Sequence, residues 1–171
     1  MRISRMRYFF PLGLFIALFL DGALSQVFAG AMFTPTLAIE SRLVLLWIVM
    51  AVCFGKIDHI ILWTVFAGLV FDLYYTGIIG AFVVIMPLIV YLTKLMYRFF
   101  TPSFIVVLLI YLIDITVATV VFYWINLLIG FTNVSMAGFI GLSLGSTLAY
   151  NLAVFVLLYF PLQRFFESFS R

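Results

Sequence analysis

Three aspartates, Asp21, Asp72 and Asp114, each lie inside a long apolar stretch. A carboxylate at bilayer depth costs about 2.5–3.5 kcal/mol on insertion scales, so a helix bundle that keeps one must turn it inward, pair it or protonate it. These acids fit a proton or cation pathway, an aspartyl catalytic pair, or hydrogen bonds to neighbouring helices or a partner protein. No Lys or Arg lies at matching depth. We therefore favour the structural or partner-binding role, with Ser, Thr, Tyr or Asn side chains, water or another protein as hydrogen-bond partners.

The second acid belongs to a small, polar helix face. Thr64, Gly68, Asp72 and Thr76 recur every four residues, and this spacing places them on one face of a helix. The same spacing returns in the first apolar stretch, at Gly13, Ala17, Asp21 and Ser25. The two stretches also share the pattern F-x-small-L-x-x-D, over residues 15–21 and 66–72. This weak echo suggests an internal repeat, although chance matches are common in a chain rich in Phe and Leu.

The elements that position these acids follow from the composition. The chain has 171 residues, of which 67% are hydrophobic and only 9% are charged. A soluble domain carries about 25% charged residues, so the composition predicts a membrane protein. The apolar stretches are continuous and lack the alternation of barrel strands, which leaves helices as the spanning structure. We predict an all-α polytopic membrane protein with a single integral membrane domain over residues 1–171 and no soluble catalytic module.

We expect six transmembrane helices in one bundle, over residues 8–30, 43–54, 60–75, 78–98, 104–129 and 139–160. The second stretch is shorter than the roughly 20 residues that a span takes, so we expect a short or tilted helix there. Pro35 ends any helix that continues from the first one, and residues 31–42 form the first real loop. Residues 161–171 are expected to form a basic and aromatic tail.

The distribution of basic residues predicts that both termini are cytoplasmic (N-in/C-in). With that orientation the inner side carries most of them: Arg2, Arg5, Arg7, Lys56, Lys94, Arg98, Arg164 and Arg171. The outer side carries Arg42 alone, and such a bias over short loops follows the positive-inside rule. The formal net charge of +3 is thereby explained without a nucleic-acid partner.

The remaining reactive side chains predict neither catalysis nor a cofactor. His59 is the only histidine, and a single histidine cannot build a zinc site. It falls on the side opposite the intramembrane acids, so no Ser-His-Asp set forms at one depth. Cys53 is the only cysteine and is expected to pack as a small hydrophobic side chain. The sequence has no phosphate-binding loop, dinucleotide fingerprint or H-E-x-x-H motif, and we predict no enzyme, no cofactor and no metal.

The last apolar stretch carries small residues at four-residue spacing: Gly141, Gly145, Ala149 and Ala153. Small side chains let two helices approach closely, and G-x-x-x-G is a motif of this kind. We expect this face to pack inside the bundle. The alternative is a seam for a partner helix, and a homodimer is also possible.

Residues 68–80 carry a resemblance to a known family. The segment GLVFDL (Gly68–Leu73), followed by GIIG (Gly77–Gly80), resembles the G-L-x-x-D-L…G-x-x-G signature of the rod shape-determining protein MreD. The order of elements is similar too, from a basic N-terminus through a short second helix to an Asp-bearing third helix and three more spans. The turn Tyr74-Tyr75-Thr76 is more aromatic than the polar turn usual in that family. The resemblance makes Gly68, Asp72, Gly77 and Gly80 candidate motif positions.

The resemblance implies a non-enzymatic scaffold of the cell-elongation machinery in the bacterial cytoplasmic membrane, surrounded by membrane lipid. Proteins of this kind work with MreC, a single-span protein with an extracytoplasmic coiled coil and β domain. They are linked with RodA, a transpeptidase and MreB filaments in lateral peptidoglycan synthesis. The family also resembles, in fold, the substrate-binding S-components of energy-coupling-factor vitamin transporters. An S-component is therefore the alternative function, with Asp21 and Asp72 lining an outward-facing pocket.

Overall fold

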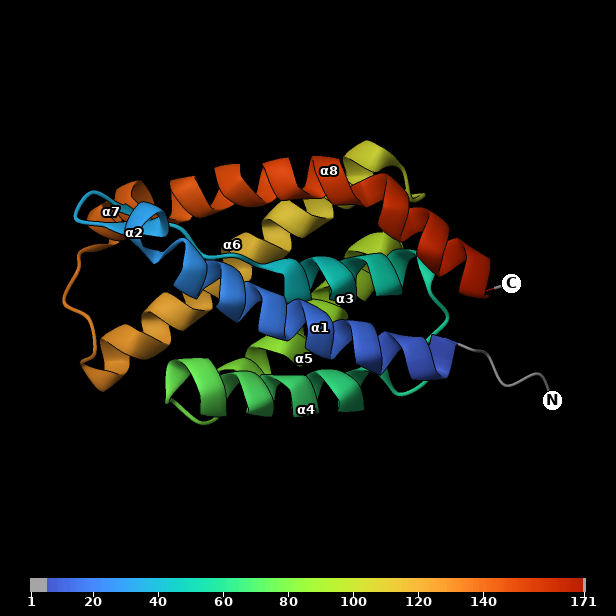
Figure 1. The fold of residues 1–171 in the computed structure, drawn as a ribbon, viewed down its shortest axis with the longest axis horizontal. Coiled ribbons are helices and arrows are strands. Elements are labelled where there is room, and N and C mark those ends of the chain that lie inside the picture. Colours follow the sequence, from blue (N-terminus) through green and yellow to red (C-terminus); the bar gives the residue numbers. More distant parts are fainter. Residues whose placement is uncertain (1–5, 171) are drawn as a thin grey trace.

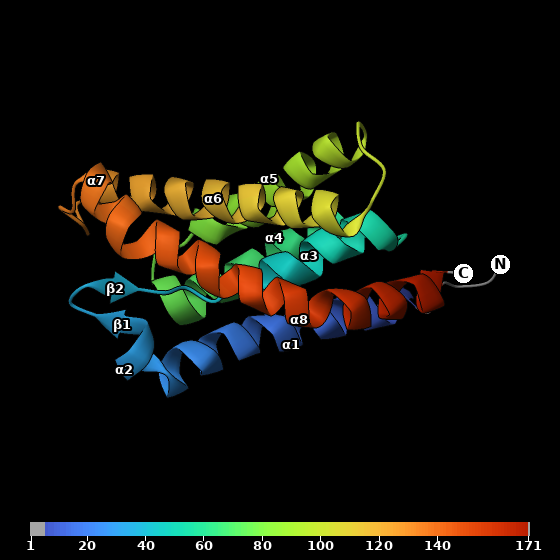
Figure 2. The same cartoon turned by 90° about the horizontal axis from the view of Figure 1, so that it is seen from above.

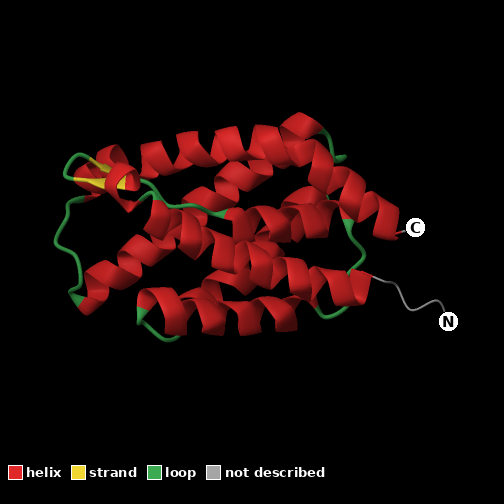
Figure 3. Cartoon of the chain, viewed as in Figure 1, coloured by secondary structure: helices red, strands yellow, loops and turns green. Residues whose placement is uncertain are grey.

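Helices dominate the structure, a computed structural model that describes residues 6–170 (Figures 1 and 3). Within these residues, six long helical segments run roughly along one axis, and the first turn of α1 and the last turn of α8 lie at the same end of that axis (Figures 1 and 2). The long helices are α1 (Met6–Val27), α3 (Leu43–Phe54), α4 (Ile60–Phe71), α5 (Ala81–Tyr97), α6 (Phe104–Ile129) and α8 (Gly145–Ser170).

The short elements gather at the end of the molecule opposite the termini (Figure 1). There, α2 (Ala29–Met32) leads into β1 (Phe33–Thr34), which pairs antiparallel with β2 (Leu37–Ala38). Pro35 lies in the turn between the two strands, so the loop expected over residues 31–42 contains a small hairpin. The short helix α7 (Met136–Phe139) lies at the same end (Figure 1).

Two π-helical turns interrupt the α-helical segments. The turn η1 (Asp72–Thr76) continues α4, and η2 (Ile140–Leu144) joins α7 to α8. Such turns are rare and are frequently found at functional sites. η1 begins at the acid of the sequence motif and η2 contains Gly141, so two of the segments singled out in the sequence depart from regular helix.

The helix bounds coincide with the expected ones in the middle of the chain and differ at its C-terminal end. Residues 43–54 and 104–129 form α3 and α6. The expected tail after residue 160 is instead helical, because α8 continues through Pro161. Phe165 and Phe166 of this extension pack their rings on Trp47, at centroid distances of 5.6 and 4.7 Å. This packing stabilises a turn that a proline inside a helix weakens.

Helix α3 lies at the centre of the bundle, where it packs against α1, α5, α6 and α8 (Figures 1 and 2). Most of its residues are buried: Val44, Leu45, Leu46, Ile48, Val49, Met50, Ala51 and Cys53. A helix that is apolar on every side belongs in a core. At 1.5 Å per residue α3 is about 18 Å long, well short of a bilayer core of roughly 30 Å. The extended residues 39–42 that precede α3 continue its path through the bundle.

Among the described residues, three segments are long and apolar enough to cross a membrane: Met6–Val27, Phe104–Ile129 and Met136–Phe169. Shorter apolar helices are Leu43–Phe54, Ile60–Thr76 and Ala81–Tyr97. The outer surface is apolar as well, with Leu62 and Leu157 exposed by 68% and 75%. Large apolar surfaces of this kind mark contact with membrane or with other proteins. Arg2, Arg5 and Arg171, which contribute to the expected orientation, lie outside the described residues.

Candidate functional site

Asp72 is fully buried at the first residue of η1, and its carboxylate binds the start of α5. The backbone N–H of Gly80 donates to Oδ2 at 2.9 Å, and that of Phe82 lies 2.9 and 3.0 Å from the two oxygens. The N–H of Val83 donates to Oδ2 and the hydroxyl of Thr76 to Oδ1, each at 3.2 Å. The first N–H groups of a helix lack partners within the helix and favour a negative charge. Asp72 therefore caps α5 from the preceding helix.

Two glycines shape the turn that brings α5 to this carboxylate. Gly77 (φ 67°) and Gly80 (φ 109°) both adopt left-handed backbone conformations, which glycine reaches without steric cost. Gly80 immediately precedes α5 and provides no side-chain cap. The G-x-x-G part of the motif thus makes a tight turn that leaves the first N–H groups of α5 open to Asp72.

Gly68 allows the backbones of α4 and α5 to approach closely. A Cβ atom at this position would lie 2.6 Å from the carbonyl carbon of Phe82 and 2.7 Å from the backbone nitrogen of Val83. These atoms belong to the same helical turn that Asp72 caps, and backbone atoms cannot rotate away as a side chain can. Thr64, one turn earlier, is also fully buried. The small polar face of α4 is therefore turned inward, against α5.

Asp21, on α1, binds the start of α3 in the same manner. Its Oδ1 accepts hydrogen bonds from the hydroxyl of Ser41 at 2.6 Å and from the N–H of Leu43 at 2.7 Å. Its Oδ2 accepts one from the N–H of Val44 at 2.9 Å. Arg42, the residue before α3, makes no side-chain cap of its own. The acid of the preceding helix provides the cap instead.

Asp21 and Asp72 thus occupy equivalent places, which gives the echo F-x-small-L-x-x-D a structural meaning. Each acid lies towards the end of one helix and caps the next long helix, across the β-hairpin in one case and across a glycine turn in the other. Polar side chains were the expected partners, and Ser41 and Thr76 fit that expectation. Backbone N–H groups, which make most of the hydrogen bonds, were missed. The sequence signal for such backbone partners is an acid that is followed by a turn and the start of a new helix.

Asp114 lies in a different environment, inside α6 and against α5. It is fully buried, and the Oγ1 atom of Thr93 lies 2.6 Å from its Oδ2. Among the described residues, its Oδ1 and the hydroxyl of Thr119 are buried without a hydrogen-bond partner. Asp114 therefore connects two helices and caps neither of them. Because the three acids have separate partners, they form no aspartyl pair.

The segment that precedes α3 is held in place by α8 and α6. Asn151 donates from Nδ2 to the carbonyl of Glu40 at 2.8 Å, and its Oδ1 accepts from the N–H of Arg42 at 3.0 Å. Thr147 accepts from the N–H of Glu40 at 3.1 Å, and the Tyr111 hydroxyl donates to the carbonyl of Arg42 at 3.1 Å. Sequence reasoning missed Asn151. The signal was present, because an amide four residues after a threonine inside an apolar helix needs buried partners.

A cavity of about 440 Å³ opens beside this segment. Charged and polar side chains line one part of it, among them Gln26, Glu40 and Arg42, and aromatic rings such as Phe71 and Phe82 line another. Arg42 is only 3% exposed and forms an ion pair with Glu40. The cavity therefore combines buried charge with an apolar wall, which is typical of sites that bind small molecules.

The small-residue face of α8 and η2 is exposed; we define it as Gly141, Gly145, Ala149 and Ala153. A Cβ atom added at Gly141 would meet nothing within 4 Å, and one at Gly145 would meet only the carbonyl of Ile140, at 3.6 Å. The expectation that this face packs inside the bundle is wrong. A different side of α8 is buried, and Thr147 and Asn151 lie on it, where their polar groups bind the segment before α3.

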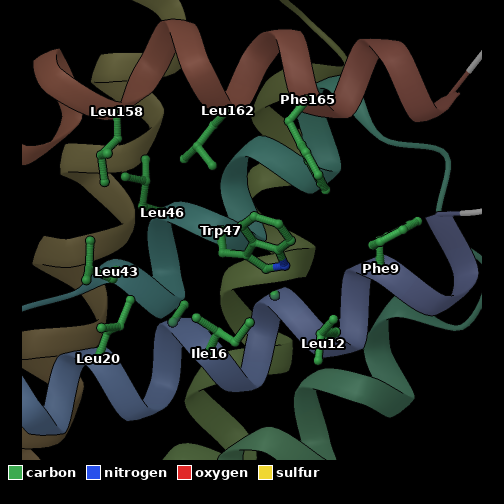
Figure 4. Close-up of a pocket in the computed structure, with 12 residues that line it drawn as sticks. Phe9, Leu12, Ile16, Leu20, Leu43, Leu46, Trp47, Leu158, Leu162 and Phe165 are labelled. Carbon is green, nitrogen blue, oxygen red and sulfur yellow. The ribbon is translucent and has the colours of Figure 1, made fainter.

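An apolar groove of about 360 Å³ lies between α1, α3 and α8 (Figure 4). Trp47 stands at its centre, with Leu12 and Ile16 on the side of α1 and Leu162 on the side of α8 (Figure 4). The indole Nε1 donates to the carbonyl of Phe10 at 3.1 Å. The residues that line the groove are apolar and offer no polar group that would select one partner.

Comparison with known families gives a match over most of the chain. A model of the family described as rod shape-determining protein MreD matches residues 6–169. The chain belongs to the MreD family. Comparison with curated proteins and with solved structures finds no match to either. The resemblance first carried by residues 68–80 therefore extends over nearly the whole chain.

Membership of the MreD family makes the chain a cell-shape-determining membrane protein, in agreement with its apolar helices. MreD is a family of shape-determining structural proteins and is not a known enzyme family. Within residues 6–170, no group of three or more His, Cys, Asp or Glu side chains could hold a metal ion. The buried acids of this family member, as described above, cap helices or connect them.

Proposed function

We propose that the chain is a non-enzymatic, multi-pass scaffold of the cell-elongation machinery in the bacterial cytoplasmic membrane. In this role it binds an MreC-like single-span protein and so supports lateral peptidoglycan synthesis. RodA, a transpeptidase and MreB belong to the larger complex. The observation that carries the proposal is the exposed small-residue face on α8 of an MreD family member.

The proposal includes six membrane spans with both termini in the cytoplasm. Support comes from the six long segments, which run along one axis and bring the described chain ends to the same end of the bundle (Figures 1 and 2). Basic residues gather in the connections at that end, including Lys56 after α3 and Arg98 after α5. The opposite end carries the hairpin and α7 (Figure 1). This distribution follows the positive-inside rule.

The small-residue face suits a partner helix better than it suits lipid. In a membrane, helix pairs are stabilised by close backbone packing, and small residues at four-residue spacing allow that approach. Gly141 and Gly145 already lie at the surface, so a partner helix reaches the backbone of α8 without rearrangement of the bundle. We assign the single transmembrane helix of the MreC-like protein to this face. A second copy of the chain on the same face is the competing occupant.

Co-purification tests the proposed function. The tagged chain is extracted from native membranes in a mild detergent, and the proteins recovered with it are identified by mass spectrometry. Recovery of a single-span coiled-coil protein, together with RodA-like or transpeptidase partners, is the expected result. Recovery of two ABC-type ATPases with a coupling membrane subunit contradicts it.

A vitamin-binding S-component is the second candidate, and the cavity beside Glu40 and Arg42 is the observation that favours it. An S-component binds its vitamin in an outward-facing pocket, and this cavity lies near the end that we propose to face outward. Asp21 lines the cavity, but Ser41 and the start of α3 already occupy its carboxylate oxygens. The scaffold is favoured because the family match is to shape-determining proteins.

A further inference from the structure

Arg42 is a charged side chain at a place where charge is costly. Its side chain is 4% exposed, and its guanidinium lies over the ring of Phe82, 5.3 Å from the centroid. It forms an ion pair with Glu40, while its Nε is buried without a hydrogen-bond partner among the described residues. A buried donor without a partner is costly, and more so when the group is charged. Buried charges are normally fully paired, so an incompletely paired one is a candidate functional site.

Hydrogen bonds from neighbouring helices hold the backbone of Glu40 and Arg42 in place. Asn151 binds the carbonyl of Glu40 and the N–H of Arg42, and Tyr111 binds the carbonyl of Arg42. Asp21 also lines the cavity, and its carboxylate is held in place by hydrogen bonds from Ser41 and from the N–H groups of Leu43 and Val44. The charge pair is therefore preorganised, as binding sites require.

The cavity of about 440 Å³ gives a ligand access to this pair. The side chain of Glu40 is 29% exposed, so its carboxylate is accessible, and Arg42 lines the same space. Phe71, Phe82 and Phe122 form an apolar wall. Ligand pockets commonly have volumes of about 300–1,000 Å³. The lining of this cavity includes Ala29 of α2 and Phe33 of β1, so the cavity lies towards the end of the bundle that carries the hairpin.

We propose that this cavity binds a zwitterionic headgroup, whose anionic oxygen binds Arg42 and whose ammonium binds Glu40. The charges of Arg42 and Glu40 cancel, so the pair favours neither a simple anion nor a simple cation. A molecule that carries both charges can bind the guanidinium of Arg42 and the carboxylate of Glu40 together. The aromatic wall then covers the carbon atoms next to the headgroup. Phosphoethanolamine has this chemistry, whether it is free or part of a lipid.

Binding of short-chain lipids to the purified full-length protein tests the proposal. The probes are dihexanoyl phosphatidylethanolamine, dihexanoyl phosphatidylglycerol, which lacks the ammonium, and free phosphoethanolamine, with bound states counted by native mass spectrometry in detergent. We expect the ethanolamine lipid to bind at least about tenfold more tightly than the glycerol lipid. A lost charge-assisted hydrogen bond is worth more than the roughly 1.4 kcal/mol that corresponds to a tenfold change in affinity. Binding of free phosphoethanolamine as tight as that of the lipid indicates a soluble ligand, and binding of the lipid alone indicates a membrane ligand. Equal affinity for the two lipids, or saturable binding of no probe, overturns the proposal.

Variants locate the binding to the charge pair. Glu40→Gln keeps the backbone hydrogen bonds of residue 40 and should lower the affinity for the ethanolamine lipid to that for the glycerol lipid. Arg42→Lys keeps the charge but loses the planar donors, and should weaken the binding of both lipids. Glu167→Gln, at an exposed carboxylate of α8, is the matched control and should bind as the unmodified protein does. An unchanged lipid preference in Glu40→Gln contradicts the assignment, and the comparison of the two lipids on the unmodified protein needs no variant to fold.

Discussion

The backbone N–H of Phe82 lies within hydrogen-bond distance of both carboxylate oxygens of Asp72, at 2.9 and 3.0 Å. The side chain of an acid on one helix thereby caps the first turn of the next helix. Lipid offers no acceptor to the N–H groups at a helix start, so a span that begins within the bundle needs one from the protein. Asp21 and the N–H of Val44 repeat this relationship at the start of α3, at 2.9 Å. Asp21 and Asp72 are thus explained by helix starts that need an acceptor, whereas Asp114 connects two helices.

Substitution of Asp72 should lower stability in a graded way. Asn keeps one acceptor oxygen but turns an NH₂ group towards N–H donors. We therefore expect Asp72→Asn to lower the free energy of unfolding by about 1–2 kcal/mol. Leu removes every acceptor, and Asp72→Leu should lose about 3 kcal/mol or more. Thermal unfolding in detergent measures both, with the exposed Asp58→Asn as the matched control. Equal losses in Asp72→Asn and Asp72→Leu would indicate that the charge itself, and not the hydrogen bonding, is required.

A single methyl group at Gly68 should destabilise the protein. The Cβ atom of Gly68→Ala would lie 2.6 Å from the carbonyl carbon of Phe82, so α4 and α5 must move apart. We expect a loss of about 1–3 kcal/mol, the usual cost of overpacking. The same change at Gly30, where an added Cβ meets nothing within 4 Å, should leave stability unchanged or slightly higher. Equal unfolding temperatures for the two variants would show that α4 and α5 do not pack closely at Gly68.

Asn151 should prove essential for the segment before α3. Asn151→Leu leaves the carbonyl of Glu40 and the N–H of Arg42 without partners, and we expect a loss of about 2–4 kcal/mol because each unpaired buried group costs about 1–3 kcal/mol. Asn126→Leu is the control, since within the described part of the chain the side-chain amide of Asn126 binds the carbonyl of Phe122 in its own helix. Limited proteolysis near residue 40 and thermal unfolding give independent measurements. Full stability of Asn151→Leu would mean that other contacts hold this segment.

Cysteine labelling should establish the orientation. Cys53 is 5% exposed, so the unmodified protein gives little background with a membrane-impermeant maleimide. Ser135 and Ser103 are both exposed residues that cap helix starts, α7 and α6. We expect Ser135→Cys to react in intact cells and Ser103→Cys only after the membrane is permeabilised. The reverse pattern would overturn the N-in/C-in orientation.

The sequence predicted the helices well because each is a continuous apolar stretch bounded by turns. It also predicted that Thr64, Gly68 and Asp72 share one face. The C-terminal extension of α8 was missed because Pro161 and the charged residues after it are typical of a helix end. Tertiary contacts of Phe165 and Phe166 with Trp47 outweigh that local signal.

The candidate site was predicted in part. Spacing alone identified the acids, but it could not distinguish a partner side chain from the backbone of a neighbouring helix, because that choice depends on how α3 and α5 begin. The small-residue spacing of α8 was visible in the sequence. Whether that face turns into the bundle or away from it was not. Asn151 decides that direction, since its amide must face the segment before α3 and thereby turns Gly145 outward.

The most direct test of the central claim is recovery of an MreC-like single-span partner with a Gly145→Ile variant. The tagged variant and the MreC-like protein of the same organism are co-expressed, and the amount of partner per tagged chain is measured after purification in a mild detergent. Because Gly145 is exposed, the variant should keep the unfolding temperature of the unmodified protein, while the bulky side chain blocks close helix approach and lowers recovery about tenfold or more. Gly30→Ile, the same change at another exposed glycine, should leave recovery unchanged. Undiminished recovery with Gly145→Ile would show that this face of α8 contacts lipid and would contradict the account.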